Sequence, residues 1–285
     1  QAPVQMHGFM TLGADDRYIL VTSRLELKAG VLFDSQQDDR SIARYDRDNG
    51  TWDVLELASP SYATLGPDGR LYVANVHHKT VSVVDLETFK EVDVVRVGEE
   101  NWAVAEGIGP KSVSFSPDGT KFVTADYEGM SVTVFDVTAE GLSNKRVIPF
   151  EGAPKSAVFS PEGNELWVVV YSLTNDETRA SLVSRGGLES MGEWYHGPQP
   201  ADEANNAYRD TKMFVLDGKT LDELASFESE RAMIAPRFSP SEPNSVYVTT
   251  SAGSVYSIDR ASLKITGEAV VGHVGLPVVC GNLAL

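Results

Sequence analysis

Gly66-Pro67-Asp68-Gly69-Arg70-Leu71-Tyr72-Val73-Ala74-Asn75, followed by Thr80-Val81-Ser82-Val83-Val84-Asp85, is the stretch that decides the fold. A Pro-Asp-Gly turn leads into one alternating apolar run. A short break then leads into a second run, which ends on Asp85. Turn residues flanked by side chains that alternate with a period of two predict consecutive antiparallel strands.

The same unit recurs along the chain. The turn and its following run return at Ser116-Pro117-Asp118-Gly119, Ser160-Pro161-Glu162-Gly163 and Ser239-Pro240, and Gly13-Ala14-Asp15-Asp16 begins a degenerate first copy. The second runs also end on Asp, and we expect these carboxylates to cap the turns that follow at Asp85, Asp136, Asp217 and Asp259. Five copies spaced about 40 to 50 residues apart predict an all-β protein, a β-propeller of four-stranded antiparallel blades.

These residues resemble a known family. Leu71-Tyr72-Val73-Ala74-Asn75, Val81-Ser82-Val83-Val84-Asp85 and Val95-Arg96-Val97-Gly98 look like the YVTN-type repeat of the superfamily of quinoprotein amine dehydrogenase-like propellers. The resemblance covers nearly the whole chain, and it implies the fold. Relatives of this kind include amine dehydrogenase heavy subunits, haem d1 domains, lactonase-like enzymes and non-catalytic secreted proteins, so the resemblance leaves the function open.

We expect a single domain over residues 1–285. Its blades are predicted at about 6–57, 58–98, 99–150, 151–228 and 229–272, with insertions at 23–39 and 172–210 and an extra closing strand at 273–285. A closed ring of five blades leaves no free strand edges, which favours it. The alternative is a six- or seven-bladed ring completed in another way, including by a second chain.

Composition and the first residues indicate which partners and which cellular compartment to expect. A formal net charge of −17 argues against nucleic acid, because phosphates would be repelled. No apolar run is long enough to span a membrane. The start at Gln1, together with the habits of the resembled family, favours a periplasmic or extracellular protein after leader removal. The single Cys280 forms no internal disulfide, so it does not decide the compartment.

Propeller topology places every histidine on one face, which we call the loop face. It carries the loops that lead into inner strands and those that join second and third strands, whereas the Pro-Asp-Gly turns lie on the opposite turn face. Neutral imidazoles gathered there favour Cu or Zn, and the predicted metal ligands are His7, His77, His78 and His273. Possible further ligands or bases are Glu100, Glu106 and Asp126. The alternative is that these are solvated histidines on a loop-rich face.

A second candidate site lies at the mouth of the central channel. Lys111 and Lys155 follow Pro110 and Pro154 at matching repeat positions, so both are predicted to hold an anionic ligand such as a carboxylate or phosphate. Trp102 and Tyr171 would wall the same pocket. The alternatives are that the lysines neutralise nearby acids and that the aromatic rings form small cores under the insertions.

Two classes of function follow from these sites. In the first, the loop face carries a metal or small-molecule site, and the protein is an oxidoreductase or a hydrolase whose insertions exclude water. In the second, the protein is a non-catalytic binding or scaffold propeller that docks a protein or glycan through its loop face. No catalytic sequence motif chooses between them.

Overall fold

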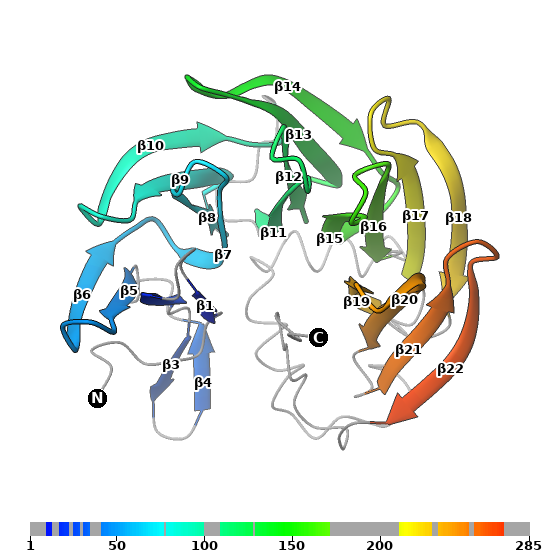
Figure 1. The fold of residues 1–285 in the computed structure, drawn as a ribbon, viewed down its shortest axis with the longest axis horizontal. Helices are drawn as coiled ribbons and strands as arrows, with labels where there is room; N and C mark the ends of the chain where they lie inside the picture. Colours follow the sequence, from blue (N-terminus) through cyan, green and yellow to red (C-terminus); the bar gives the residue numbers. More distant parts are fainter. Residues whose placement is uncertain are drawn as a thin grey trace.

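The structure, a computed structural model, describes residues 10–12, 17–22, 25–28, 31–34, 41–76, 78–99, 109–127, 129–171, 211–229, 233–250 and 254–270. These residues form five four-stranded antiparallel sheets and one two-stranded hairpin. The sheets stand as the blades of a propeller around a common axis (Figure 1). The predicted fold class is therefore confirmed. Within the described ranges, no helix is long and apolar enough to cross a membrane.

Each blade uses four strands, in sequence order from the axis outward. The first blade holds β1 (Met10–Leu12), β2 (Tyr18–Thr22), β5 (Ser41–Asp46) and β6 (Thr51–Glu56). The second holds β7 (Pro60–Leu65), β8 (Leu71–Asn75), β9 (Thr80–Asp85) and β10 (Lys90–Arg96), and the third holds β11 (Pro110–Phe115), β12 (Lys121–Asp126), β13 (Ser131–Thr138) and β14 (Gly141–Pro149).

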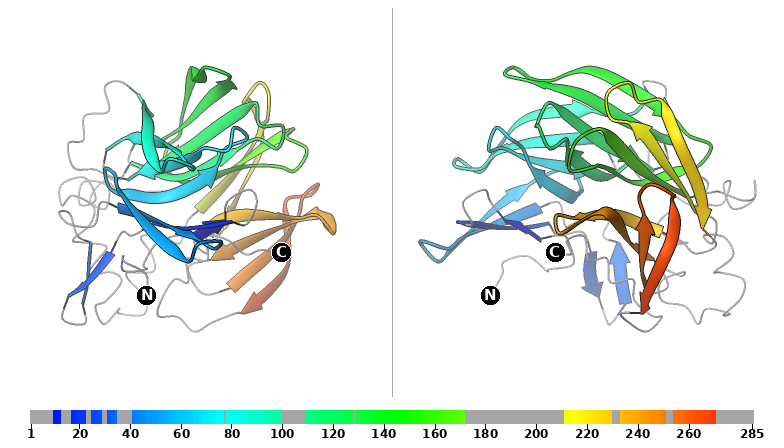
Figure 2. Two further views of the ribbon diagram at one scale, coloured as in Figure 1. Left: turned by 60° about the vertical axis from the view of Figure 1, so that its left-hand side comes forward. Right: turned by 45° about the vertical axis from the view of Figure 1, so that its right-hand side comes forward.

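The last two blades repeat this order. The fourth holds β15 (Ala153–Phe159), β16 (Glu165–Tyr171), β17 (Thr211–Asp217) and β18 (Glu223–Ser229), and the fifth holds β19 (Met233–Ser239), β20 (Glu242–Thr250), β21 (Ser254–Asp259) and β22 (Lys264–Val270). The predicted insertion after β2 contains a hairpin of its own, β3 (Leu25–Lys28) with β4 (Val31–Asp34). Figure 2 shows this hairpin in blue, standing beyond the blades. The predicted closing strand at 273–285 lies outside the described residues.

The turns after the third strands were predicted to depend on Asp. The carboxylate of Asp85 accepts the Thr88 amide at 2.7 Å. Asp217 accepts two turn amides, and Asp259 accepts the Ser262 amide, so these three caps are confirmed. The prediction for Asp136 is wrong because β13 runs on to Thr138. Asp136 therefore lies within the strand, and its carboxylate accepts hydrogen bonds from Nζ of Lys121 and Nδ2 of Asn144.

Apolar side chains fill the space between successive blades. Leu20 and Ile42 of the first blade meet Leu71 and Val73 of the second, whereas Tyr72 on the opposite face of β8 packs with Phe122 of the third. Both faces of β8 are therefore buried. β12, β16 and most of β13 are buried on both faces in the same way. The core residues of the third and fourth blades include Val123, Val134, Leu166, Val168, Trp167 and Met213.

In the fifth blade, only one face of the sheet is buried as deeply as both faces of β8 are. Val246 and Val248 of β20 are fully buried against the fourth blade, whereas the alternate residues Tyr247 and Thr249 remain partly exposed. β21 shows the same alternation, and every residue of β22 is exposed. Alternating burial is the pattern of a sheet with one core face and one wetter face. The outer side of the fifth sheet is therefore less tightly covered than the faces inside the stack.

Small hydroxyl side chains on the first and second strands join neighbouring blades. Thr22 donates to the carbonyl of Ser61 at 2.6 Å, linking the first two blades. Ser114 donates to the carbonyl of Ala157, whose amide donates in turn to Ser112. Ser156 donates to the carbonyl of Ile234 at 2.9 Å. These bonds satisfy backbone groups that the inner edges of the sheets would otherwise leave unpaired.

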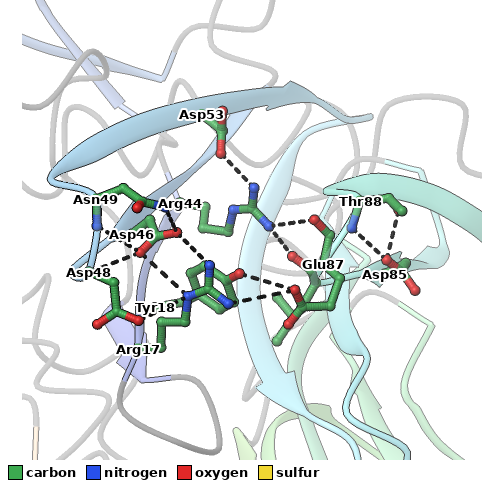
Figure 3. Close-up of polar contacts among 11 residues, drawn as sticks. Arg17, Tyr18, Arg44, Asp46, Asp48, Asn49, Asp53, Asp85, Glu87 and Thr88 are labelled. Atoms are coloured by element: carbon green, nitrogen blue, oxygen red, sulfur yellow. Dashed lines mark hydrogen bonds and ion pairs between the residues drawn. The ribbon is translucent and has the colours of Figure 1, made fainter.

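Arginines link blades on the turn face. Figure 3 shows Arg44 of β5 reaching the backbone carbonyls of Leu86 and Glu87 in the second blade. The guanidinium groups of Arg44 and Arg17 each lie 4.7 Å from the centre of the Tyr18 ring. Arg17 also donates to Asp46 at 2.9 Å, and this hydrogen bond holds the pKa of that carboxyl below its ordinary value. This cluster is a structural junction between two blades.

Arg260 makes the corresponding junction between the last two blades. It follows β21 and reaches Glu165 at 2.9 Å and Glu162 at 2.7 Å in the fourth blade. The guanidinium also lies over the ring of Phe238, 5.6 Å from its centre. One side chain therefore combines two ion pairs across the blade boundary with a ring contact inside the fifth blade.

We expect Arg260→Met to lower the free energy of unfolding by about 2 kcal/mol in urea at pH 7, because it removes both ion pairs and retains an apolar stem. The hydrogen bond from Arg260 lowers the pKa of Glu162 from its ordinary 4.5. The Glu162 contribution is therefore present above about pH 4.5 and is lost as the pH falls through the lowered value. The control is Arg70→Met, whose exposed pair with Asp68 spans 3.8 Å and is expected to contribute less than about 0.5 kcal/mol. Equal losses in the two variants would contradict this role.

Candidate functional site

The innermost strands carry a distinctive set of charges. These strands are β1, β7, β11, β15 and β19, which surround the axis in Figure 1. As the structure bounds them, they contain Lys111, Lys155 and Arg237 and no Asp or Glu. The whole chain has 41 acidic against 24 basic residues, so these five described strands differ in the sign of their charge from the chain as a whole.

A backbone irregularity positions the two lysines. The pairing of β11 with β12 shifts register between Pro110 and Ser112, and that of β15 with β16 shifts between Pro154 and Ser156. Lys111 and Lys155 are the extra residues at these two bulges. Bulges aim a side chain differently from its neighbours in a regular strand. The structure thus places both lysines at matching points of adjacent inner strands, as the repeat spacing predicted.

A pair of contacting aromatic rings begins beside Lys111. The side chain is buried, and its Nζ lies 5.6 Å from the centre of the Tyr127 ring. Tyr127 contacts Tyr171 edge to face, with 6.1 Å between ring centres, and both tyrosines are buried. Tyr171 was predicted to wall an open pocket. The Tyr171 side chain lies in the core between blades, where it contacts Tyr127, the ring next to the Lys111 ammonium group. Lys155 is partly buried on the next inner strand.

Sequence reasoning missed Tyr127 and Arg237. Tyr127 occupies the same repeat position as Tyr171, so comparing the two copies would have found it. Arg237 follows Pro236, as the two lysines follow Pro110 and Pro154, but it lies nearer to the turn of its repeat. Burial lowers the pKa of the Arg237 guanidinium below its ordinary value, and the hydroxyl group of Tyr62 on β7 interacts with it electrostatically.

The described residues cover little of the predicted metal site. His78 is exposed in the turn between β8 and β9, where its backbone amide donates to the carbonyl of Asn75 at 3.0 Å. His7, His77 and His273 lie outside the described residues, as do Trp102, Glu100 and Glu106. Within the described ranges, no group of three or more His, Cys, Asp or Glu side chains is placed to hold a metal ion. The metal site therefore remains a prediction.

Asp126 was considered as a further ligand or base. It ends β12 and is fully buried. Its carboxyl accepts hydrogen bonds from the hydroxyls of Thr124 and Thr133. Burial raises the pKa of the Asp126 carboxyl to about 7. A carboxyl enclosed in this way does not reach a ligand directly.

These features define a β-propeller whose described inner strands carry cations and no acid. The family model described as "Lactonase, 7-bladed beta-propeller" matches residues 29–171, which is half of the chain, so the chain belongs to this family. The YVTN resemblance is thereby supported at the level of a propeller family. The family description specifies seven blades, and the described residues of this chain form five. No curated protein matches the chain in sequence.

Solved structures with the same fold have unrelated roles. A chain of hydrazine synthase from Kuenenia stuttgartiensis superposes with a TM-score of 0.61 at 15% identity, over 89% of this chain and 62% of that one. The β-propeller domain of Cps50 (Swd1) from Myceliophteria thermophila gives 0.60 at 11%, over 94% and 73%. A chain of the mitotic checkpoint complex gives 0.61 at 10%, over 95% and 67%. This chain spans less than two thirds of the hydrazine synthase chain, and identities this low show the fold alone.

Proposed function

We propose that this propeller is a hydrolase that opens small lactones carrying a carboxylate or phosphate, which it binds at the centre of its loop face. The observation that carries the proposal is the charge of the innermost strands, which hold three cations and no acid in a chain of net charge −17. Membership of the lactonase family supports hydrolysis as the reaction.

The lysines suit an anion because of their place in the fold. Lys111 and Lys155 approach the axis from neighbouring blades, and Arg237 lies on the inner strand of the next blade. Cations on the walls of a low-dielectric site attract anionic substrates even though the rest of the protein is acidic. In this proposal, Lys111 and Lys155 bind the substrate anion and Arg237 adds to the local field.

The reaction needs only water as co-reactant. The oxygen of water adds to the lactone carbonyl, and the ring C–O bond breaks. One water proton passes to the ring oxygen, leaving a hydroxy acid. A metal held by the predicted histidines would instead supply an activated water, which elemental analysis of the purified protein tests.

We expect Lys111→Met and Lys155→Met each to lower kcat/KM for a carboxylated δ-lactone at least about tenfold, because each removes a charged hydrogen-bond donor. A pH-stat assay of acid release measures this. δ-Valerolactone is the neutral comparison, and its hydrolysis should change less than about twofold. Lys264→Met, at the start of the exposed outer strand β22, is the control for a general effect of charge.

The same variants distinguish catalysis from simple binding. If neither lactone is hydrolysed and citrate binding measured by calorimetry is lost in both lysine variants, the protein is a binding propeller and the hydrolase proposal is wrong. If citrate binds wild type and variants equally, the lysines do not form an anion site. Loss of activity towards both lactones in a folded Lys111→Met would place this side chain in the chemistry as well as in substrate binding.

A further inference from the structure

We propose that the hydroxyl of Ser61 is a third ligand-binding group of the loop-face site, donating a hydrogen bond to the anion that Lys111 and Lys155 bind. The inference rests on the proposed function for the identity of the ligand. For the role of the hydroxyl, it rests on the repeat position and the burial of Ser61. A neutral donor in such a site adds direction to the attraction that the two ammonium groups supply.

Ser61 occupies the position in the second blade that the lysines occupy in the next two. It directly follows a proline near the start of an inner strand, as Lys111 and Lys155 do. The pairing of β7 with β8 shifts register between Pro60 and Ala63, and the pairings of β11 and β15 shift beside their own prolines. These three inner strands follow one another around the axis (Figure 1). Three successive blades therefore carry a hydroxyl and two ammonium groups at the same level of their inner strands.

The Ser61 hydroxyl is enclosed, yet it has no partner among the described residues. Ser61 is fully buried, and its Oγ makes no hydrogen bond within the part of the chain that the structure describes. Buried hydroxyls in folded proteins nearly always have a hydrogen-bond partner. Ser156, the buried serine next to Lys155, follows this rule by donating to the carbonyl of Ile234 at 2.9 Å. The unpaired hydroxyl of Ser61 therefore indicates a partner from outside these residues, and an anion held by the lysines can accept its hydrogen.

The backbone around Ser61 is held by hydrogen bonds on both sides of the strand. Thr22 of the first blade donates to the Ser61 carbonyl at 2.6 Å. The carbonyl of Ser59, two residues earlier, accepts the Val76 amide at 3.0 Å. Ser59 has a φ of 58°, a left-handed conformation that is uncommon for a residue other than glycine and that often occurs at ligand-binding sites. A donor on such a fixed segment binds a ligand without first having to be ordered.

Ser61→Ala tests this role, with ligand binding and stability as separate readouts. We expect the variant to bind citrate about tenfold more weakly in calorimetry, because a hydrogen bond to a charged acceptor is lost. Without citrate, its melting temperature should rise by about 1–3 °C, because an apolar group replaces an unpaired buried hydroxyl. The control is Ser156→Ala, which leaves the Ile234 carbonyl unpaired. This control should lower the melting temperature and change the citrate affinity less than about twofold.

The outcomes separate this inference from the proposed function. If Lys111→Met and Lys155→Met weaken citrate binding and Ser61→Ala does not, the anion site stands and Ser61 is not part of it. A lower melting temperature for ligand-free Ser61→Ala also refutes the inference, because it would show that the hydroxyl has a partner within the protein. That partner would be Asn75, which pairs in register with Pro60 and whose buried Oδ1 also lacks a partner among the described residues. If citrate does not bind the wild-type protein, the proposed anion site is wrong and the inference fails with it.

Discussion

Replacing Trp167 by alanine is expected to lower the free energy of unfolding by about 3–5 kcal/mol, measured in urea at pH 7. Trp167 is fully buried between the fourth and fifth blades. Its ring meets Phe238 edge to face with 5.9 Å between centres, and its Nε1 donates to Glu165 at 2.8 Å. Truncation leaves a cavity that the flanking sheets cannot close, because hydrogen bonds fix their strands.

The chain contains a matched control for this variant. Tyr247 of the fifth blade pairs with Ser257 on β21 as Trp167 pairs with Val215 on β17, but its side chain is partly exposed. We expect Tyr247→Ala to lower the free energy of unfolding by only about 1 kcal/mol. A loss as large as that of Trp167→Ala would show that the outer face of the fifth sheet is covered as tightly as the interior faces.

Gly218→Ala is expected to destabilise the protein by about 3 kcal/mol and to lower the melting temperature by several degrees. A Cβ atom at this position would overlap the carbonyl oxygen of Gly163 and lie 2.9 Å from the carbonyl carbon of Asn164. These are backbone atoms, and the Gly218 amide is itself hydrogen-bonded to Asn164 at 2.8 Å. Neither side of the contact can move away without breaking the turn.

Gly267→Ala is the control for the loss of a glycine. A Cβ there would meet its nearest neighbour, the Cβ of Ser257, at an ordinary 3.8 Å. Gly267 lies on the exposed strand β22, so alanine is expected to be neutral or stabilising by up to about 1 kcal/mol. Similar melting temperatures for the two variants would mean that the fourth-blade turn relaxes more easily than its geometry indicates.

The repeat spacing predicted the blades because turn chemistry and strand alternation are local properties. The same spacing placed Lys111 and Lys155 at matching positions, since each follows a proline at the start of an inner strand. Local patterns could not predict that the Tyr171 ring lies behind Tyr127, because that depends on how two blades approach. They also missed Arg237, which faces the centre from a different point of its repeat.

The predictions for Asp136 and Asp126 are limited in the same way, because both were drawn from local sequence. Asp136 ends an apolar run, which predicted a turn cap, but one-dimensional spacing does not show that β13 continues beyond it. Asp126 was predicted as a possible further ligand or base beside the histidines of the loop face. Its burial comes from the neighbouring blade, whose Gly98 closes over Thr133. Contacts between blades decide what these carboxylates do, and a repeat pattern describes each blade separately.

The hydroxyl links between inner strands separate two tasks within one short segment. Ser112, Ser114 and Ser156 hold neighbouring blades through backbone groups, whereas Lys111 and Lys155 occupy the bulges beside those links. Under the proposed function, the side chains that hold the ring together and those that select the ligand are therefore different residues of the same strands. Evolution or protein design can replace the two central lysines with other residues while the links between blades keep the ring intact. The same scaffold can then accommodate ligands of different charge.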